Sequence, residues 1–412
     1  MRFLSLIMGL TSLAALSPTQ PAPHTFKTPE GAYAIVRFKT SHSGPTVPAA
    51  AVDLMVDGQT DQVILTPAVD RSPYEALLGP FRAGLHEARL GPSSLWPTVD
   101  VPLRIENTAI EIVTPADPRF ALFSNAPAIG LRPDTIGTAS DLPLLMYVED
   151  TTEGDSRWLR YSIIFSHEDG GTPGPALMAR WGRTTDIELA YEVELRDGRI
   201  VQARYQGPDH RVMQNERLGV RPPFLLVSTL NNMFLDRGRS AARVRMVPLK
   251  KDLTVRSRES VMDDHPWIYR VMAAELARER PAGVEDARDY LYVDLRLTSR
   301  SAGIAVGART ADGTTRWSDR GRADLVVSRQ GEMRIAIPAA ASHPPVALTV
   351  RCDPRPEPNG SSDPGHCDVD IRKAFRLGGE YLPEDPLFPA ARLKIEAGTA
   401  RDLPAAAGRI ER

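Results

Sequence analysis

The chain has only two cysteines in 412 residues, no excess charge, and no apolar run beyond its N-terminus long enough to span a membrane. Two cysteines exclude a disulfide-dense scaffold, and their spacing excludes a Cys-x-x-Cys metal or redox site. The net charge of −2 and a pI near 6.5 give no general attraction to polyanions, so nucleic acid is not an expected partner. Lysine is scarce beside arginine, while alanine, proline and glycine abound, which indicates a GC-rich bacterial genome.

The common catalytic motifs are also missing. The sequence contains no Gly-x-Ser-x-Gly, no His-Glu-x-x-His, no phosphate-binding glycine loop and no dinucleotide fingerprint. These absences disfavour the large enzyme classes, but glycan-cleaving and lyase sites need only dispersed carboxylates. No period of 20 to 50 residues repeats, which disfavours a solenoid or a propeller.

The N-terminus is typical of a secretory signal peptide. Residues 1–22 contain a short positive start, an apolar core over Phe3–Leu16 and small residues before a proline-rich spacer. We therefore expect a secreted or periplasmic protein without a transmembrane segment in its mature chain. In an oxidising compartment Cys352 and Cys367 should form a disulfide, closing a loop worth about 3 kcal/mol.

Short alternating runs bounded by turn residues predict a mostly β protein of two or three β-sandwich domains, the first Ig-like, with one connecting helix. Asp57-Gly58 predicts a turn between two early strands, and Pro266 predicts the start of the helix. The expected parts are an Ig-like sandwich (25–115), a central sandwich (116–260), a connecting helix (261–285), a β-rich C-terminal domain with the disulfide loop (286–397) and a tail (398–412).

The hairpin around Asp197-Gly198 can be predicted by register. A two-residue turn would place Val193 opposite Gln202, whereas a three-residue turn including Arg196 would place Val193 opposite Val201. The second register gathers more apolar residues on one face, so we predict the three-residue turn.

Three carboxylates before and within this hairpin are the first candidates for chemistry. Asp186 and Glu188 lie two apart on the expected strand and share a face at about 6 to 7 Å, with Glu168 in the preceding loop. They could act as acid and base or hold a divalent cation, the one cofactor that the sequence suggests. The same pattern equally fits a strand with a wet face of Asp186, Glu188, Glu192 and Glu194 and a dry face of alternating apolar residues.

Further candidates lie outside this trio. Asp209 and His210 follow Gly207-Pro208 at an expected turn tip and could take part in catalysis. Trp181 and Trp317 lie beside turn residues, where an exposed ring could stack on a sugar. Arg243 and Arg245 lie in a basic run, 237–258, that could hold an anionic polymer or could pair with the acidic strand 186–194.

The runs Arg160-Tyr-Ser-Ile-Ile-Phe-Ser-His-Glu168 and Gly182-Arg-Thr-Thr-Asp-Ile-Glu188 support one family comparison. They resemble the strand and metal-binding heptapeptide of secreted necrosis-inducing (NPP1-like) proteins and of Vps62-related β-sandwich proteins. The family heptapeptide reads Gly-His-Arg-His-Asp-Trp-Glu, and the resemblance implies a β-sandwich with a cation site at Glu168, Asp186 and Glu188. Arg183 and Thr185 stand where the family has histidines, and an arginine there would oppose a cation.

The sequence leads to three hypotheses. The first is an exported, non-catalytic binding or surface-associated protein that engages a polysaccharide or other envelope component. The second is a secreted carboxylate- or cation-dependent hydrolase or lyase with its site on the central domain. The third is a cation-dependent, membrane-active protein. The hypotheses differ on Asp186 and Glu188, which an active site would place in a cleft with perturbed acidity and not on an open strand face.

Overall fold

The computed structural model describes residues 22–42, 49–67, 73–93, 95, 103–138, 140–168, 170–340, 342–355 and 365–405. Apart from Ala22, the expected signal peptide lies outside these residues. The described chain is mostly β, as predicted, and is built of several largely antiparallel sheets. None of its helices has the length and apolar character needed to cross a membrane.

The N-terminal part is a pair of packed sheets. Its turn at Asp57-Gly58 is confirmed, with both residues at positive φ between β3 and β4. The apolar faces of the two sheets enclose a core around Phe38, Leu54 and Leu78. One sheet has the order β1 (His24–Thr28), β6 (Gly84–Pro92), β3 (Ala49–Val56), β4 (Gln59–Pro67), and the other β5 (Tyr74–Leu78), β2 (Tyr33–His42), β7 (Leu103–Val113).

The central part has a larger and a smaller sheet. The larger has the order β13 (Arg211–Gln214), β12 (Arg199–Gly207), β11 (Asp186–Arg196), β10 (Ser156–Phe165), β9 (Pro143–Glu153), β17 (Leu249–Lys250). The smaller has the order β15 (Phe234–Leu235), β14 (Phe224–Val227), β8 (Ala128–Gly130), β16 (Arg243–Val244). Two pairings are parallel, β14 with β8 and β17 with β9.

The predicted three-residue hairpin turn is wrong. Arg196 pairs with Arg199, so the turn is the two-residue Asp197-Gly198, and a bulge after Glu194 then shifts the register. Val193 consequently lies opposite Ala203, and Tyr191 opposite Tyr205. The bulge moves the pairing by one residue, so odd-numbered residues again face odd-numbered ones and the apolar side chains still share one face.

The predicted connecting helix is confirmed as α5 (Trp267–Glu279), which begins after Pro266 and ends where Arg280 takes a left-handed conformation. Ile268, Met272 and Leu276 recur at helical spacing and are buried. The described chain contains four shorter α-helices, not predicted: α1 (Phe120–Ser124), α2 (Pro133–Thr138), α3 (Gly174–Trp181) and α4 (Val261–Asp264). It also contains short 3-10 turns: η1 (Pro208–His210), η2 (Arg258–Ser260), η3 (Ala287–Asp289) and η4 (Ala323–Leu325).

The C-terminal part is a second pair of packed sheets, joined by the predicted disulfide between Cys352 on β22 and Cys367 on β23. The predicted tail is partly wrong, because β25 lies within it and pairs with β22. One sheet has the order β21 (Gly331–Pro338), β18 (Tyr290–Arg300), β23 (His366–Phe375), β24 (Ala391–Glu396), and the other β20 (Thr315–Trp317), β19 (Ala302–Thr310), β22 (Pro345–Pro354), β25 (Thr399–Pro404).

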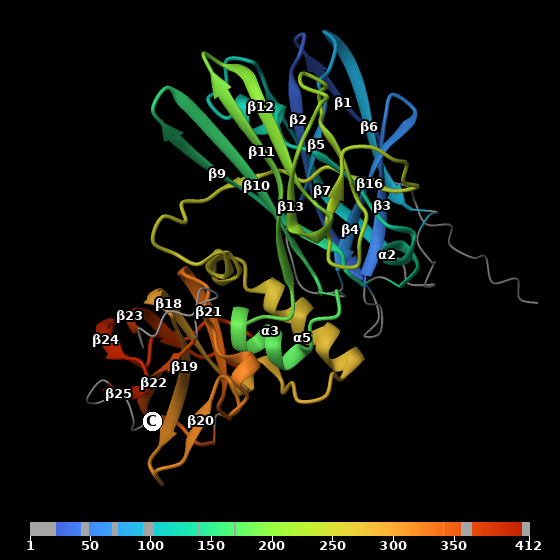
Figure 1. The fold of residues 1–412 in the computed structure, drawn as a ribbon. Coiled ribbons are helices and arrows are strands. Elements are labelled where there is room, and N and C mark those ends of the chain that lie inside the picture. The colour runs from blue at the N-terminus through green and yellow to red at the C-terminus, as the bar shows by residue number, and fades with distance from the viewer. Residues whose placement is uncertain are drawn as a thin grey trace, which may run out of the picture.

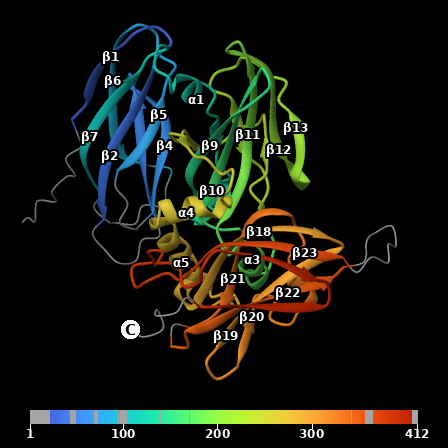
Figure 2. The same cartoon turned by 90° about the vertical axis from the view of Figure 1, so that its left-hand side faces the viewer.

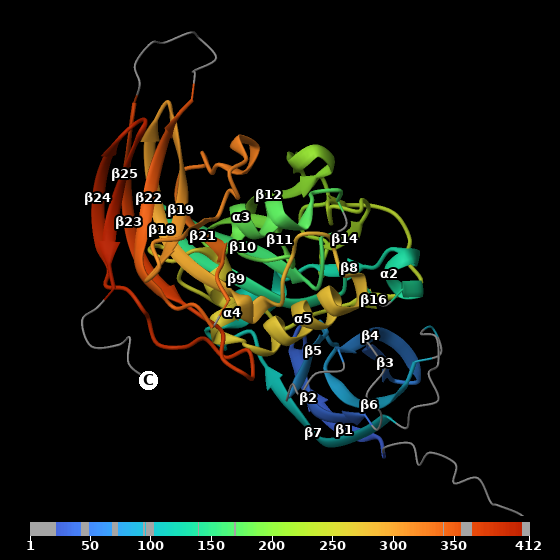
Figure 3. The ribbon, with the colours of Figure 1, turned by 90° about the horizontal axis from the view of Figure 1, so that it is seen from below.

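The three parts are packed together. Figure 1 shows α3 and α5 between the C-terminal sheets and the rest of the molecule, and Figure 2 shows the N-terminal and central sheets side by side above the C-terminal sheets. Viewed from below, the N-terminal sheets again lie beside the central ones (Figure 3). One continuous core runs from Tyr33 and Leu77 through the central sheets to Ile268 on α5 and Tyr292 on β18. The cavity described next lies in the central part of this assembly.

Candidate functional site

A cavity of about 390 Å³ lies where the start of β11 meets the surrounding loops. It brings together the three carboxylates singled out from the sequence: Glu168, Asp186 and Glu188. Its other lining residues are mostly polar or charged: Gly170, Thr172, Trp181, Arg183, Gln206, His210, Asn231 and Arg258.

The interpretation of Asp186 and Glu188 as a wet strand face is wrong. Both faces of β11 are buried, and the exposed fractions of Asp186 and Glu188 are 1% and 6%. Further along the strand, a bulge at Ala190 shifts the register with β10, and beyond it Glu192 accepts hydrogen bonds from Arg160 on β10 and Arg204 on β12. Arginines of the neighbouring strands therefore cover Glu192, and the cavity residues surround Asp186 and Glu188.

Asp186 is held by a buried polar chain. The side-chain amide of Asn232 donates to Asp186 Oδ2 at 3.0 Å and to Asp141 Oδ1 at 2.8 Å. On the other side, Arg183 Nη1 lies 3.9 Å from Asp186 Oδ1. Asn232 has φ +49°, a left-handed conformation that asparagine tolerates better than most residues. These contacts fix the position of the Asp186 side chain at the start of β11.

Glu188 lines the cavity beside Gln206 and His210. Gln206 Nε2 donates to Glu188 Oε2 at 2.8 Å and lies 2.7 Å from His210 Nδ1. Asn231 Nδ2 lies 3.0 Å from His210 Nε2, so both ring nitrogens of the histidine are engaged. His210 and Asp209 both have positive φ, and such backbone strain gathers at functional sites. Of this predicted pair, His210 reaches the cavity, whereas Asp209 is exposed and is not among the lining residues.

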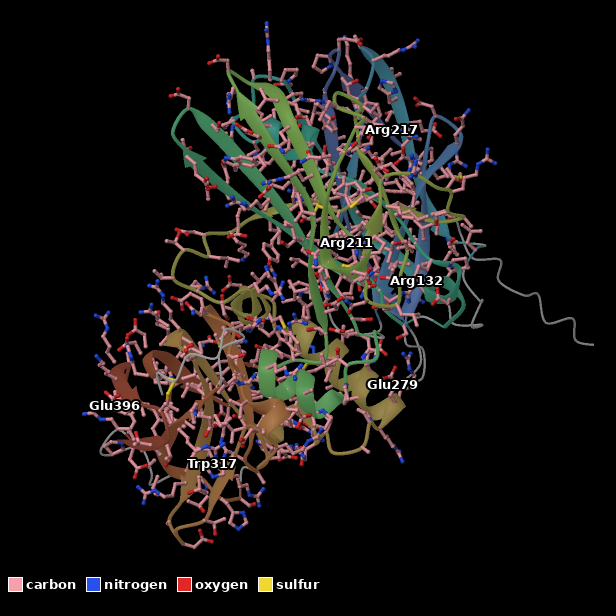
Figure 4. All side chains as sticks on the ribbon, viewed as in Figure 1. Arg132, Arg211, Arg217, Glu279, Trp317 and Glu396 are labelled. Atoms are coloured by element: carbon pink, nitrogen blue, oxygen red, sulfur yellow. A yellow bond between two sulfur atoms is a disulfide. The ribbon has the colours of Figure 1, made fainter. Side chains whose placement is uncertain are left out.

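Glu168 comes from the loop between β10 and α3. Its backbone nitrogen donates to Thr184 O at 3.1 Å, and Thr172 Oγ1 donates to its Oε1 at 3.3 Å. The preceding residue is anchored to α5, because His167 Nε2 lies 3.0 Å from Glu279 Oε2; Glu279 is labelled on this helix in Figure 4. The predicted connecting helix, α5, therefore anchors the loop that carries Glu168 at one wall of the cavity.

The acidity of the two glutamates is strongly perturbed. Burial, and after it the negative charge of Asp186, raises the pKa of Glu168 to about 7. The same two causes raise the pKa of Glu188 to about 9. At neutral pH the cavity therefore holds one protonated carboxyl, Glu188, and one poised near its midpoint, Glu168. Such a pair can donate and accept a proton in one reaction.

The donor set does not suit a divalent cation. The buried guanidinium of Arg183 lies beside Asp186, in the position where the resembled family has a histidine, and supplies positive charge of its own. Within the described ranges, no three His, Cys, Asp or Glu side chains form a cluster fit for a metal ion. The raised pKa values of Glu168 and Glu188 suit proton transfer better than binding of a cation.

Of the predicted tryptophans, Trp181 lines the cavity and Trp317 does not. Trp181 is half-buried at the end of α3, between Arg180 and Arg329, whose guanidinium carbons lie 5.9 and 5.5 Å from its ring centroid. Trp317 lies in the C-terminal sheets (Figure 4), under the guanidinium of Arg351 at 4.8 Å.

The predicted arginine stripe is wrong. Arg245 is buried against the N-terminal sheets, where its backbone nitrogen donates to Gln62 Oε1 at 2.7 Å. Arg243 reaches the same sheets, with Nη2 3.2 Å from Asp61 Oδ1. The two arginines therefore join the N-terminal and central parts, and their contacts are with Gln62 and Asp61, not with the acidic strand 186–194.

Sequence reasoning missed several residues of the site. Gln206, Asn231 and Asn232 carry no charge and belong to no motif, so nothing in the sequence marks them. Arg258 lies in the predicted basic run, but only the fold separates it from Arg243 and Arg245 and places it in the cavity. Comparisons with protein families, curated proteins and solved structures find no match for this chain.

Proposed function

We propose that this protein is an exported enzyme that cleaves a carbohydrate polymer by carboxyl acid–base catalysis in the central cavity. The observation that carries the proposal is the enclosure of Glu168 and Glu188 beside Asp186, with pKa values raised to about 7 and about 9. Perturbed carboxyls in a cleft are typical of catalytic acids and bases. The disulfide is consistent with an oxidising compartment.

Each carboxyl has a distinct role. Glu188, protonated at neutral pH, donates the proton to the leaving oxygen of the scissile bond. Glu168, with its pKa near 7, acts as the base. In hydrolysis it takes a proton from the water whose oxygen bonds to the anomeric carbon as the C–O bond to the leaving sugar breaks, and in elimination it takes the sugar proton whose electron pair forms the new C=C bond. Asp186, held between Asn232 and Arg183, raises the pKa of both glutamates, and its carboxyl lies where it can stabilise positive charge that develops on the substrate. Trp181 adds an aromatic ring to the lining of the cavity, where it can contact a sugar.

The test is cleavage of a panel of polysaccharides by the full chain. Reducing ends report any cleavage, and ultraviolet absorbance reports the unsaturated product of an elimination. We expect Glu188→Gln and Glu168→Gln each to lower kcat about 10²- to 10⁴-fold, because each removes a proton-transferring group. Asp209→Asn is the matched control, since Asp209 borders His210 but does not line the cavity and asparagine tolerates its positive φ. Equal activity in all three variants contradicts the proposal.

A second candidate function is a non-catalytic binding protein that uses the same cavity. The half-buried ring of Trp181 beside a polar cavity favours it, because stacking rings next to hydrogen-bonding groups suit glycans. This function predicts that an oligosaccharide binds, that Trp181→Ala abolishes the binding, and that no bond is cleaved at any pH. Cleavage lost in Glu188→Gln excludes it.

A further inference from the structure

Three arginines surround a single buried carboxylate behind the cavity. Oε1 of Glu259 lies 3.6 Å from Arg183 Nε, 3.8 Å from Arg258 Nε and 3.8 Å from Arg329 Nη2. Burial opposes ionisation of Glu259, but Arg329, Arg183 and Arg258 outweigh it and hold its pKa below the usual range. A second carboxyl, that of Asp186, lies 3.9 Å from Arg183. This cluster therefore contains three guanidinium groups and two carboxyl groups.

The three guanidinium groups differ in access to the cavity. The side chain of Arg183 is 2% exposed, and its guanidinium lies beside the buried carboxyls of Glu259 and Asp186. Arg329 does not line the cavity and lies over the Trp181 ring. Arg258 lines the cavity, and 38% of its side chain is exposed. Arg329 is 32% exposed but lies outside the lining, so the accessible positive charge of the cluster within the cavity is that of Arg258.

The neighbours of Arg258 in the cavity suit a sugar ring. The amides of Gln206 and Asn231 and the hydroxyl of Thr172 can hydrogen-bond to ring substituents, and the Trp181 side chain adds an aromatic contact. A guanidinium binds a carboxylate with two parallel hydrogen bonds, a geometry that a planar carboxylate on a sugar satisfies. One accessible guanidinium matches one negative charge, whereas a phosphate monoester would bring close to two beside Asp186.

We propose that the cavity takes a uronic-acid polysaccharide and that Arg258 pairs with the carboxylate of one sugar unit. The proposal rests on the proposed function for its catalytic meaning, but it assigns a substrate class and a binding residue of its own. Arg258 recognises the charge, and Glu168 and Glu188 act on the bond beside it.

Binding can be measured without turnover in a Glu188→Gln background. The probes are an oligogalacturonate and its methyl ester, which differ only in the charge of the carboxyl groups, titrated by calorimetry. We expect the free acid to bind roughly 30-fold more tightly than the ester, and Arg258→Gln to remove that preference. Arg258→Lys should restore part of it, because lysine keeps the charge and loses the paired geometry.

Arg256→Gln is the matched control. Arg256 lies two residues from Arg258, pairs with Asp264 at 3.2 Å and does not line the cavity. This variant should bind both probes like its parent. Melting curves of every variant verify folding, and Arg258→Lys keeps the test valid if Arg258→Gln folds poorly.

The outcomes separate this proposal from the proposed function. Equal binding of acid and ester, or binding of the acid that survives Arg258→Gln, overturns the uronate assignment; cleavage of a neutral polymer would then leave the enzyme intact. Preference for a sulfated oligosaccharide over the uronate also overturns it. Arg258-dependent binding of the uronate without cleavage by the unsubstituted chain supports the assignment and refutes the enzyme. If neither probe binds and no polymer is cleaved, both proposals are wrong.

Discussion

Replacing Glu188 by glutamine should stabilise the protein progressively as the pH rises. The folded pKa of Glu188, about 9, lies above the value near 4.3 of an unfolded glutamate. A raised carboxyl pKa stabilises the fold fully below the unfolded value, and this contribution is lost as the pH rises through the folded value. Between the two, the folded state binds a proton that the unfolded state has released, so the free energy of unfolding falls with pH.

The magnitude follows from the width of that window. One proton of difference changes the free energy of unfolding by about 1.4 kcal/mol per pH unit. Glutamine cannot ionise, so Glu188→Gln removes this slope and gains up to about 4 kcal/mol over the unsubstituted chain between pH 5 and pH 8. At pH 5 the two proteins should be nearly equal, because glutamine is isosteric with protonated glutamate and still accepts from Gln206.

The assay is a series of melting curves from pH 5 to pH 8. About 1 kcal/mol corresponds to roughly 2 to 4 °C in a domain of 150 to 250 residues, so the difference in Tm should widen to several degrees. Glu194→Gln is the control on the same strand: hydrogen bonds from Ser156 and Arg196 lower the pKa of Glu194, so that variant should not gain stability with pH. Parallel curves for Glu188→Gln and the unsubstituted chain would refute a protonated Glu188.

Three further predictions test the site and its support. Polymer cleavage should show a bell-shaped pH profile, rising through about 7 as Glu168 ionises and falling through about 9 as Glu188 does; a profile flat across this range contradicts the assigned roles. Gly182→Ala should destabilise by about 1 to 3 kcal/mol in a urea titration, because φ is +62° and a Cβ would meet Arg334 Cγ at 2.6 Å, whereas Gly198→Ala, with positive φ in open space, should cost less. Arg334→Met should cost about 3 to 5 kcal/mol by removing the buried guanidinium that pairs with both Asp263 and Asp294, while Arg322→Met at an exposed pair should cost far less; similar losses would argue against the buried network.

Features set by local chemistry were predictable from the sequence. The turn at Asp57-Gly58 and the start of α5 at Pro266 depend on neighbouring residues alone, and both are confirmed. The disulfide followed from the cysteine count. Whether the acidic side chains of β11 are buried depends on which side chains of other strands cover them. Alternation along one strand carries no such information.

The candidate site was predicted in part for the same reason. Glu168, Asp186 and Glu188 lie within 21 residues of one another, so sequence proximity brought them together. Arg258 and Asn231 reach the cavity from distant segments, and the closely spaced Arg243 and Arg245 turn instead to the N-terminal sheets. A charge run records composition, whereas the direction of each side chain depends on the backbone path.

Because one core runs from Tyr33 to Tyr292, the N-terminal sheets bury apolar side chains against the central part and should not fold independently of it. A gene cut after residue 115 would release two fragments whose apolar faces and buried arginine lack their cover, and both should aggregate when expressed alone. A fusion of the first 115 residues to an unrelated domain should also fail to fold, because the apolar side chains at this interface are complementary only to the central sheets. In related proteins the N-terminal and central parts should therefore occur together in one chain, with insertions confined to surface loops.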